Sequence, residues 1–583
     1  AINEISLKDT TDLRLVAYGY GDGGGGPTPG MIESGRRTAS LEGMPEVENM
    51  TISAFMRELE TQQAELPVFA DELYLELHRG TLTQMHNVKR KNRKAELALR
   101  DMEYFHVLAG KKVTEAQDKR LKTLLKNQFH DILPGTCITP VYDVYNEEMD
   151  RLLADYAADT AADIAELVAP SENYTAFNTL SFDRNDAVLI EGAKGFAKNY
   201  PSQKYTDVCG REVLAVGGVK LPGFGSSVIE LDDAPVNAPS AFSYDGTRLT
   251  TPFAEICFDE NGYISSYVDK ATGRELRKTG GDPLNVLLFG EDVPKDWDNW
   301  DLERDIVYKL KPVTGFKGRV VVTDGAVELR LRSTFDVGDG TTLTQDMVCY
   351  ADSPRIDFHT LVDWNSPHRL LKVGFDLDVA AAAARNEIQY GHVKRPTTQN
   401  NTLEYAKFEV CNYKWTDVSE SRFGVAVLND CKYGVTVTDC NIRLSLHRGG
   451  THPDFTGDKG VHEMTYAILP HAGDFSAENT VYPAYMLNVP VVAAKGEAEV
   501  EPIVKIGAPN IICEAVKPAE DGEGTVVRLY ECEGAKTTAA VSLRGAAKAT
   551  LTNLLEDPIC DLPVENGEVK LIFRPFEIKT IRF

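Results

Sequence analysis

Residues 86–109 read HNVKRKNRKAELALRDMEYFHVLA, which is a long helical pattern. Apolar side chains recur in it at three- and four-residue steps, and Gly110 follows as a natural stop. The apolar positions are Ala95, Ala98, Leu99, Met102, Phe105 and Ala109. The pattern predicts an amphipathic helix with one face packed against neighbours.

Two more helices are predicted on the carboxyl side. Thr114 and Gln117 form a capping box that opens the first one. Its expected buried stripe is Leu121, Leu124, Leu125 and Phe129. The sequence DILPG (131–135) breaks the pattern, and Thr139 followed by Pro140 predicts a cap with a first-turn proline. The next helix is expected to run to about Val168 with Val144, Leu152, Tyr156, Ile164 and Leu167 inward. Three long helices in succession predict a bundle, and a shorter helix is expected at 50–63.

The rest of the chain, from about residue 172, alternates between apolar and polar side chains. The clearest runs are GRVVVTD, VELRLRSTFDV, FGVAVLND and YGVTVTD. Alternation of this kind, interrupted by Gly, Asp, Asn and Pro, is typical of strands. Several antiparallel β-sandwiches are therefore expected.

Composition limits the classes of partner. The chain has 583 residues and a net charge of −26, which disfavours nucleic acid and anionic membrane surfaces, whereas a neutral sugar is compatible with it. There is no apolar run long enough for a membrane span. The ten cysteines form no CxxC pair, and the first residues lack the pattern of a signal peptide. We therefore expect a cytoplasmic protein.

Two stretches carry candidate catalytic carboxylates. In YGYGDGGGGPT (18–28), four glycines follow Asp22, so the backbone can approach a ligand closely. A flexible turn with a solvated aspartate explains the same pattern. In ELYLELHRGT (72–81), alternation predicts a strand with leucines on one face and Glu76 among the polar side chains on the other. A half-exposed strand with no function is the alternative.

Two further stretches have ligand-binding character. In NQFHDILPGT (127–136), His130 and Asp131 stand where a helix ends, and such an imidazole can bind a metal. A hydrogen-bonded structural histidine is the alternative, since tetrahedral zinc needs three or four ligands. Residues 391–474 mix aromatic and charged side chains as sugar-contacting surfaces do, although packing within a large sandwich explains most of them individually.

Taken in order, these stretches resemble the carboxy-terminal part of the α-mannosidases of glycoside hydrolase family 38, in the cytosolic and bacterial branch. The resemblance extends from YGYGDGGGGPT to AKFEVCNYKWTDVSE and LNDCKYG. It implies a multidomain fold: a remnant of an α/β barrel-like catalytic domain, a three-helix bundle, and antiparallel β-sandwich domains including a large supersandwich. The expected boundaries are 1–82, 83–169, 170–240, 241–500 and 501–583.

The resemblance also implies roles for individual residues. His130 matches the bundle histidine that binds zinc, and Asp131 matches the aspartate that binds sugar hydroxyls. Asp22 matches the position of the general acid/base, and Glu76 is a second candidate for that role or for sugar binding. The family's remaining ligands, a His-x-Asp pair, and its nucleophile are expected in an amino-terminal catalytic half outside these residues, and no His-x-Asp pair is expected within them. The implied substrate is a mannose-containing oligosaccharide, and a homo-oligomer is possible. The other hypothesis is a non-catalytic carbohydrate-binding or structural β-sandwich protein.

Overall fold

The computed structural model describes residues 11–62 and 68–583, and these fall into two compact units, Ala1–Tyr74 and Leu75–Phe583. The smaller unit contains a short 3-10 helix, η2 (Gly21–Gly23), and the helices α1 (Pro29–Thr38) and α2 (Ile52–Thr61). Thr51 caps α2 by accepting a hydrogen bond from the backbone N–H of Ala54. The short helix expected at 50–63 is therefore confirmed within the described residues.

The strand predicted at 72–81 is wrong. Residues 72–78 form no strand, and a 3-10 helix, η3 (Arg79–Leu82), follows them. The side chains of Leu73, Leu75 and Leu77 are exposed. Alternation stabilises a strand only where a neighbouring strand completes the backbone hydrogen bonds and one face is buried, and neither condition is met among the described residues.

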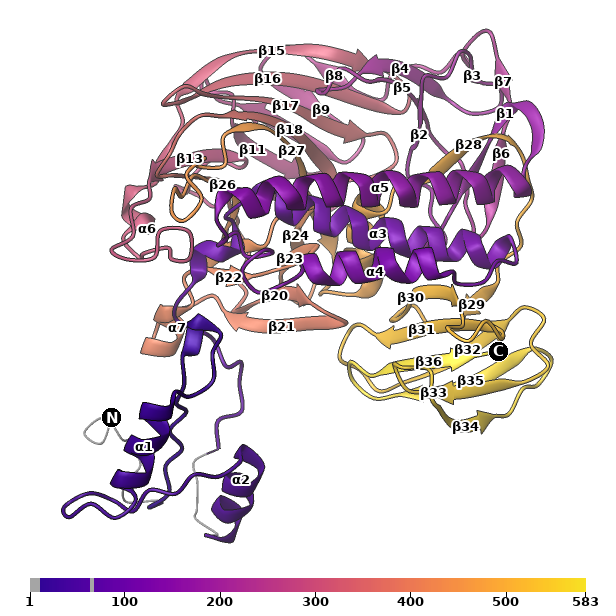
Figure 1. Ribbon diagram of the computed structural model, residues 1–583. Coiled ribbons are helices and arrows are strands. Elements are labelled where there is room, and N and C mark those ends of the chain that lie inside the picture. Colours follow the sequence, from indigo (N-terminus) through magenta and orange to yellow (C-terminus); the bar gives the residue numbers. More distant parts are fainter. Residues whose placement is uncertain (1–10, 63–67) are drawn as a thin grey trace. The chain divides into compact units, whose positions relative to one another are not determined.

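The three predicted long helices form a bundle, as expected. They are α3 (His86–Leu108), α4 (Glu115–Asn127) and α5 (Thr139–Leu167), and they lie side by side (Figure 1). The capping box of Thr114 and Gln117 is present. The bundle core consists of buried apolar side chains from all three helices and the residue before α3: Met85, Val88, Ala95, Met102, Leu124, Tyr142, Tyr145, Met149, Leu152 and Tyr156.

Some of the expected core positions are exposed. Leu125, Phe129 and Val144 each have more than half of their surface in solvent. The spacing of apolar residues predicts which helix face is apolar, but it does not show whether a neighbouring element covers that face. The helix α4 therefore buries fewer apolar side chains than predicted. Thr139 is also not the cap of α5, because Ile138 occupies that position and the Thr139 hydroxyl donates instead to Asp454 Oδ1 at 2.6 Å.

The largest β element is a sandwich of a nine-stranded and a six-stranded antiparallel sheet. Phe358 and Tyr466 of the first sheet are in ring contact with Phe375 of the second, so the two sheets share a core. The nine-stranded sheet has the order β15 (Gly315–Asp324), β16 (Glu328–Gly338), β17 (Thr341–Tyr350), β18 (Ile356–Trp364), β27 (Gly460–Ala472), β24 (Phe423–Asn429), β23 (Trp415–Ser419), β20 (Ala383–Ile388) and β21 (Gly391–Pro396). The six-stranded sheet has the order β14 (Lys311–Pro312), β13 (Val286–Glu291), β19 (Arg369–Asp376), β26 (Asn441–Arg448), β25 (Gly434–Thr438) and β22 (Val410–Cys411).

Smaller sheets are built mostly from strands that precede the sandwich in the chain, and one of their strands follows it. One set comprises β28 (Val492–Glu497), β1 (Ala169–Phe177) and β6 (Ser226–Ile229), then β2 (Val188–Glu191), β5 (Glu212–Val216) and β4 (Ser202–Thr206), and the pair β3 (Phe196–Ala197) and β7 (Leu231–Asp232). A five-stranded sheet follows, with β12 (Arg274–Glu275), β11 (Ile264–Asp269), β10 (Ala254–Phe258), β9 (Arg248–Thr250) and β8 (Ser243–Tyr244). Short helices connect the strands: α6 (Ile306–Lys309), α7 (Thr402–Ala406), η4 (Ala477–Val481) and α8 (Tyr482–Asn488).

The carboxy-terminal domain packs against the bundle. Its sheets are β30 (Ile511–Pro518), β31 (Thr525–Glu531), β36 (Ile578–Arg582), β33 (Ala549–Thr552) and β34 (Pro558–Leu562), and β29 (Val504–Ile506), β32 (Thr537–Leu543) and β35 (Glu568–Phe573). Tyr104 and Phe105 of α3 belong to the core of this domain. The helical bundle followed by antiparallel sheet domains confirms the predicted multidomain order.

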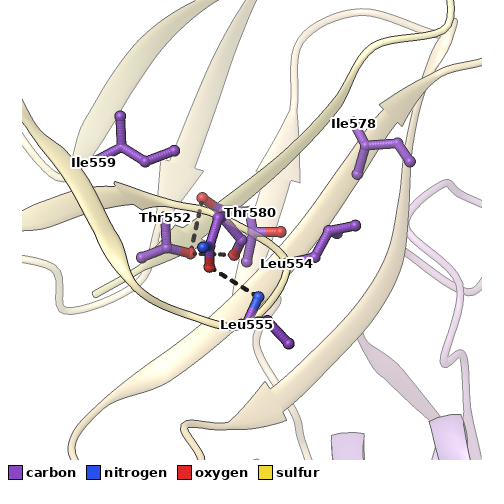
Figure 2. A pocket seen from close by; sticks show the side chains of 7 residues that line it. Thr552, Leu554, Leu555, Ile559, Ile578 and Thr580 are labelled. Atoms are coloured by element: carbon purple, nitrogen blue, oxygen red, sulfur yellow. Dashed lines mark hydrogen bonds between the residues drawn. The ribbon is translucent and has the colours of Figure 1, made fainter. Parts of the chain in front are cut away.

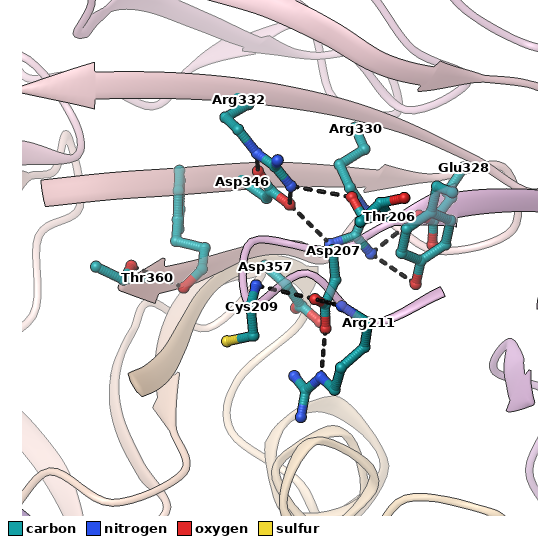
Figure 3. A network of polar contacts seen from close by, with 12 residues as sticks. Thr206, Asp207, Cys209, Arg211, Glu328, Arg330, Arg332, Asp346, Asp357 and Thr360 are labelled. Atoms are coloured by element: carbon teal, nitrogen blue, oxygen red, sulfur yellow. Dashed lines mark hydrogen bonds and ion pairs between the residues drawn. The ribbon is translucent and has the colours of Figure 1, made fainter. Parts of the chain in front are cut away.

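Buried polar contacts also tie the β domains to one another. Arg330 of β16 donates to Glu328 at 3.0 Å and to the Tyr205 hydroxyl of β4 at 2.9 Å (Figure 3). Arg332, on the same strand, pairs with Asp346. Arg330 and Glu328 are both buried on β16 and compensate each other's charge, whereas the hydrogen bond to Tyr205 joins the large sandwich to the small sheet.

No helix in the described ranges is both long enough and apolar enough to cross a membrane.

Candidate active site

The turn between α4 and α5 carries His130 and Asp131. It is closed by its own backbone: the N–H groups of Ile132 and Leu133 donate to Phe129 O at 3.0 and 3.1 Å, and Thr136 N donates to Asp131 O at 3.0 Å. The Thr136 hydroxyl donates to Asp131 Oδ1 at 3.1 Å. The break that DILPG predicted is therefore an ordered, hydrogen-bonded turn.

His130 and Asp131 point away from the bundle core. The His130 side chain is 76% exposed and the Asp131 side chain 41% exposed, and His130 Nε2 lies 3.3 Å from Asp131 Oδ2. An exposed imidazole beside an exposed carboxylate can bind a divalent metal or a sugar hydroxyl. Among the described residues, this pair belongs to no group of three potential metal ligands. A tetrahedral zinc site here therefore requires ligands from elsewhere.

The turn is fixed by close contacts on its inner side. Gly135 has φ +93°, and a Cβ atom there would lie 2.8 Å from Gln84 O. Asn299, from the loop after β13, donates to Gly135 O at 3.1 Å. The turn therefore packs against the residues before α3 and against the large sandwich.

The two candidate catalytic carboxylates lie in different units. Asp22 is in η2 of the smaller unit, where Gly24 adopts a left-handed conformation and Asp22 is exposed. Glu76 is exposed in the larger unit, and its backbone carbonyl accepts a hydrogen bond from Arg79. The structure therefore places His130 and Asp131 in one side-chain pair. Asp22 and Glu76 remain two alternative candidates for the general acid/base, one in each unit.

A second cluster of potential ligands lies in the sandwich, and sequence analysis missed it. His447 of β26, His462 of β27 and Asp458 of the intervening loop are buried, with ligand atoms within 4.8 Å of one another. His447 Nε2 lies 3.2 Å from Asp458 Oδ2, close to the separation of about 3.3 Å expected between two ligands of tetrahedral zinc. The Nδ1 atoms of both histidines have no hydrogen-bond partner.

The charges around this cluster oppose a cation. The Lys432 ammonium is buried beside it and contacts His86 Nδ1, and His86 in turn stacks edge-on against His462. Burial, followed by the charge of Lys432, holds the pKa of His86 well below its usual range. Asp458 already accepts a hydrogen bond from the backbone of His86 at 2.7 Å, and His462 lies 2.8 Å from its carbonyl oxygen. The cluster is therefore better explained as a hydrogen-bonded core.

One expectation about motifs was wrong. A His-x-Asp triplet does occur within these residues, at His452–Pro453–Asp454. Asp454 is fully buried and accepts hydrogen bonds from Thr139 and Thr456. Its carboxylate therefore joins the start of α5 to the sandwich. Because this aspartate is used for packing between the bundle and the sandwich, a His-x-Asp triplet alone is a weak signal of a metal site.

A surface hollow lies in the carboxy-terminal domain. It has a volume of about 440 Å³ and is lined by Leu554, Leu555, Ile559, Ile578 and neighbouring threonines (Figure 2). The lining has no carboxylate and no imidazole. It therefore has no group able to catalyse hydrolysis.

Three family models match successive parts of the chain, in the same order as the domains of the structure. Residues 76–167 match the alpha mannosidase middle domain, residues 249–456 the glycosyl hydrolases family 38 C-terminal domain, and residues 510–581 the family 38 C-terminal beta sandwich domain. Alpha-mannosidase 2C1 of Homo sapiens is 33% identical over 602 residues, covering 98% of this chain and 56% of that protein. Alpha-mannosidase G of Dictyostelium discoideum is 31% identical, covering 99% of this chain and 58% of that protein.

The fold is shared with a solved structure. An alpha-mannosidase from Enterococcus faecalis V583 superposes with a TM-score of 0.76 at 15% identity, over 96% of this chain and 75% of that one. The chain spans only a little more than half the length of the two relatives above.

Proposed function

The chain belongs to glycoside hydrolase family 38, whose middle and carboxy-terminal domains it contains, and we propose that it forms part of a retaining, zinc-dependent α-mannosidase. The observation that carries the proposal is the exposed His130–Asp131 pair on an ordered turn at the end of the bundle. The likeness to proteins named alpha-mannosidase over 98% of the chain supports it. The proposed substrate is a mannose-containing oligosaccharide.

In this proposal His130 holds zinc through its exposed imidazole, and Asp131 accepts hydrogen bonds from sugar hydroxyls. A zinc ion held there would supply Lewis-acid chemistry, stabilising negative charge that develops on sugar oxygens. The other ligands and the nucleophilic carboxylate come from an amino-terminal half that this sequence does not include. The matches to the middle and carboxy-terminal domains of the family, together with the 56% coverage of the human relative, support this assignment.

Asp22 or Glu76 then serves as the general acid/base. A retaining glycosidase uses two carboxyl groups about 5–5.5 Å apart, one as nucleophile and one as proton donor and acceptor. A general acid near neutral pH must be removed from water, because burial favours its protonated form. Both candidates are exposed here, so the role requires that further polypeptide or substrate covers one of them.

The proposed location of the protein is the cytoplasm. All ten cysteines are free of disulfides, which supports the cytoplasm as the location. A homo-oligomer stays a prediction.

A second candidate function is carbohydrate binding without hydrolysis. Trp297 favours it, because its side chain is exposed and its backbone adopts φ +61°, which is rare for a bulky residue. Exposed aromatic rings stack on sugar rings. In that case the chain binds mannosides without hydrolysing them, and His130→Ala leaves that binding unchanged.

Zinc content and hydrolysis of an aryl α-mannoside test the proposal in the enzyme that contains this chain. His130→Ala is expected to remove zinc and to lower kcat/KM by about 10³-fold or more, because a ligand to the metal is lost. His452→Ala, also exposed but in the His-x-Asp triplet, is the matched control and should keep both. Full zinc occupancy and turnover in His130→Ala would overturn the assignment.

A further inference from the structure

The ammonium group of Lys89 is buried directly beneath the turn that carries His130 and Asp131. Lys89 lies in the first turn of α3 and is 5% exposed. Its Nζ donates to the carbonyl oxygens of Leu133 and Pro134, each at 3.1 Å, and to Gln84 O at 2.5 Å. All three donors of the ammonium are therefore used by backbone carbonyls.

These carbonyls belong to two segments that are distant in sequence. Gln84 precedes α3, whereas Leu133 and Pro134 follow Asp131 by two and three residues. Lys89 thus joins the inner side of the turn to the start of the bundle. The close approach of Gly135 to Gln84 brings the same two segments together. A charged donor that binds three carbonyls favours one arrangement of the peptide planes, with their oxygens inward.

The exposed pair depends on this backbone for its position. The contacts that the structure gives the His130 side chain are the Asp131 carboxylate and the ring of Phe129, at 4.2 Å between ring centroids. Both neighbours lie in the same turn. The direction of the imidazole is therefore set by the turn and not by the packed core of the bundle.

Burying the Lys89 ammonium at this position costs desolvation free energy. Burial lowers the pKa of Lys89 to about 7, and only part of that effect is offset by the charge of Asp458. A buried ammonium lowers stability unless hydrogen bonds compensate for the lost water. Its presence here is explained if the turn has to be kept in one conformation.

We propose that Lys89 is a positioning residue, which fixes the His130–Asp131 turn through the carbonyls of Leu133 and Pro134. The proposal rests on the proposed function for the roles of His130 and Asp131. The bracing of the turn by Lys89 is independent of that function.

Hydrogen exchange of the full chain tests the bracing. Lys89→Met is expected to speed amide exchange at residues 131–136 at least tenfold, while the middle of α5 exchanges as before. Lys91→Met is the matched control, since Lys91 lies on the same helix and is partly buried but pairs with Asp150 and Asn146 of α5 instead of the turn. Unchanged exchange in Lys89→Met would overturn the proposal. If Lys89→Met fails to fold, Lys89→Gln, which keeps a donor, takes its place under the same criteria.

Zinc affinity and steady-state kinetics of the enzyme that contains this chain test the positioning. Lys89→Met is expected to weaken zinc binding about tenfold or more and to lower kcat, and Lys89→Arg to restore part of both. A merely structural lysine would lower the unfolding midpoint and leave zinc affinity unchanged well below that temperature, which would refute positioning. If the unmodified enzyme hydrolyses no mannoside, the proposed function fails, and hydrogen exchange still decides whether Lys89 braces the turn.

Discussion

Replacing Gly135 with alanine tests how tightly the candidate active-site turn is packed. Gly135 has φ +93°, and a Cβ atom added to it would lie 2.8 Å from the carbonyl oxygen and 3.0 Å from the carbonyl carbon of Gln84. Both are backbone atoms, which cannot move aside as a flexible side chain does. Gly110→Ala provides a matched control in the same bundle, because Gly110 has φ +67° and nothing lies within 4 Å of its added Cβ.

The two substitutions separate backbone strain from steric overlap. A left-handed conformation costs an alanine about 1–2 kcal/mol, and this applies to both positions. Overpacking against fixed atoms adds roughly 1–3 kcal/mol at Gly135 alone. We therefore expect destabilisation of about 1 kcal/mol for Gly110→Ala and about 3 kcal/mol for Gly135→Ala.

Urea unfolding followed by circular dichroism at a helical wavelength measures both effects. The bundle supplies the three long helices, so its loss dominates this signal. If Gly135→Ala destabilised the bundle no more than Gly110→Ala does, the turn would not be packed against Gln84. The explanation of the ordered turn would then be wrong.

Two other perturbations follow from buried charged or titratable groups. Burial lowers the pKa of His392 to about 4, so between pH 6.5 and 4 the unfolded chain binds the proton that the folded chain excludes, and stability falls as the pH falls. The loss of unfolding free energy from this group is about 2 kcal/mol between pH 7 and pH 5. His392→Gln should therefore reduce the difference between the unfolding free energies at those two pH values by about 2 kcal/mol. An unchanged difference would contradict the assignment of this pH dependence to His392. Lys372→Met should cost about 3–5 kcal/mol because it leaves the buried Glu409 carboxylate without its ammonium partner, and the double variant Lys372→Met/Glu409→Leu should recover most of the loss in thermal unfolding. A double variant as unstable as the single one would show that the charge is not the cause.

The bundle was predictable because its signals are local. The spacing of Met102 and Phe105 and the capping box of Thr114 lie within a few residues of one another, and local backbone geometry converts them directly into a buried face and a helix start. Leu125 was misjudged for a different reason: burial depends on a partner that the helix's own sequence does not specify. The segment 72–78 was misjudged likewise, because a strand needs a neighbour to complete its hydrogen bonds.

The candidate site shows the same division between local and distant information. A histidine and an aspartate at a helix break are visible in the sequence, and the structure places them in an exposed pair. The residues that fix this pair are not visible there, since a lysine in a helix ordinarily extends into solvent and Lys89 does not. Its acceptors, Leu133 and Pro134, lie more than forty residues along the chain, as do the contacts from Asn299 to Gly135. The sequence can therefore name the groups that would touch a metal or a sugar, whereas the precision with which they are held is a property of contacts that only the folded chain creates.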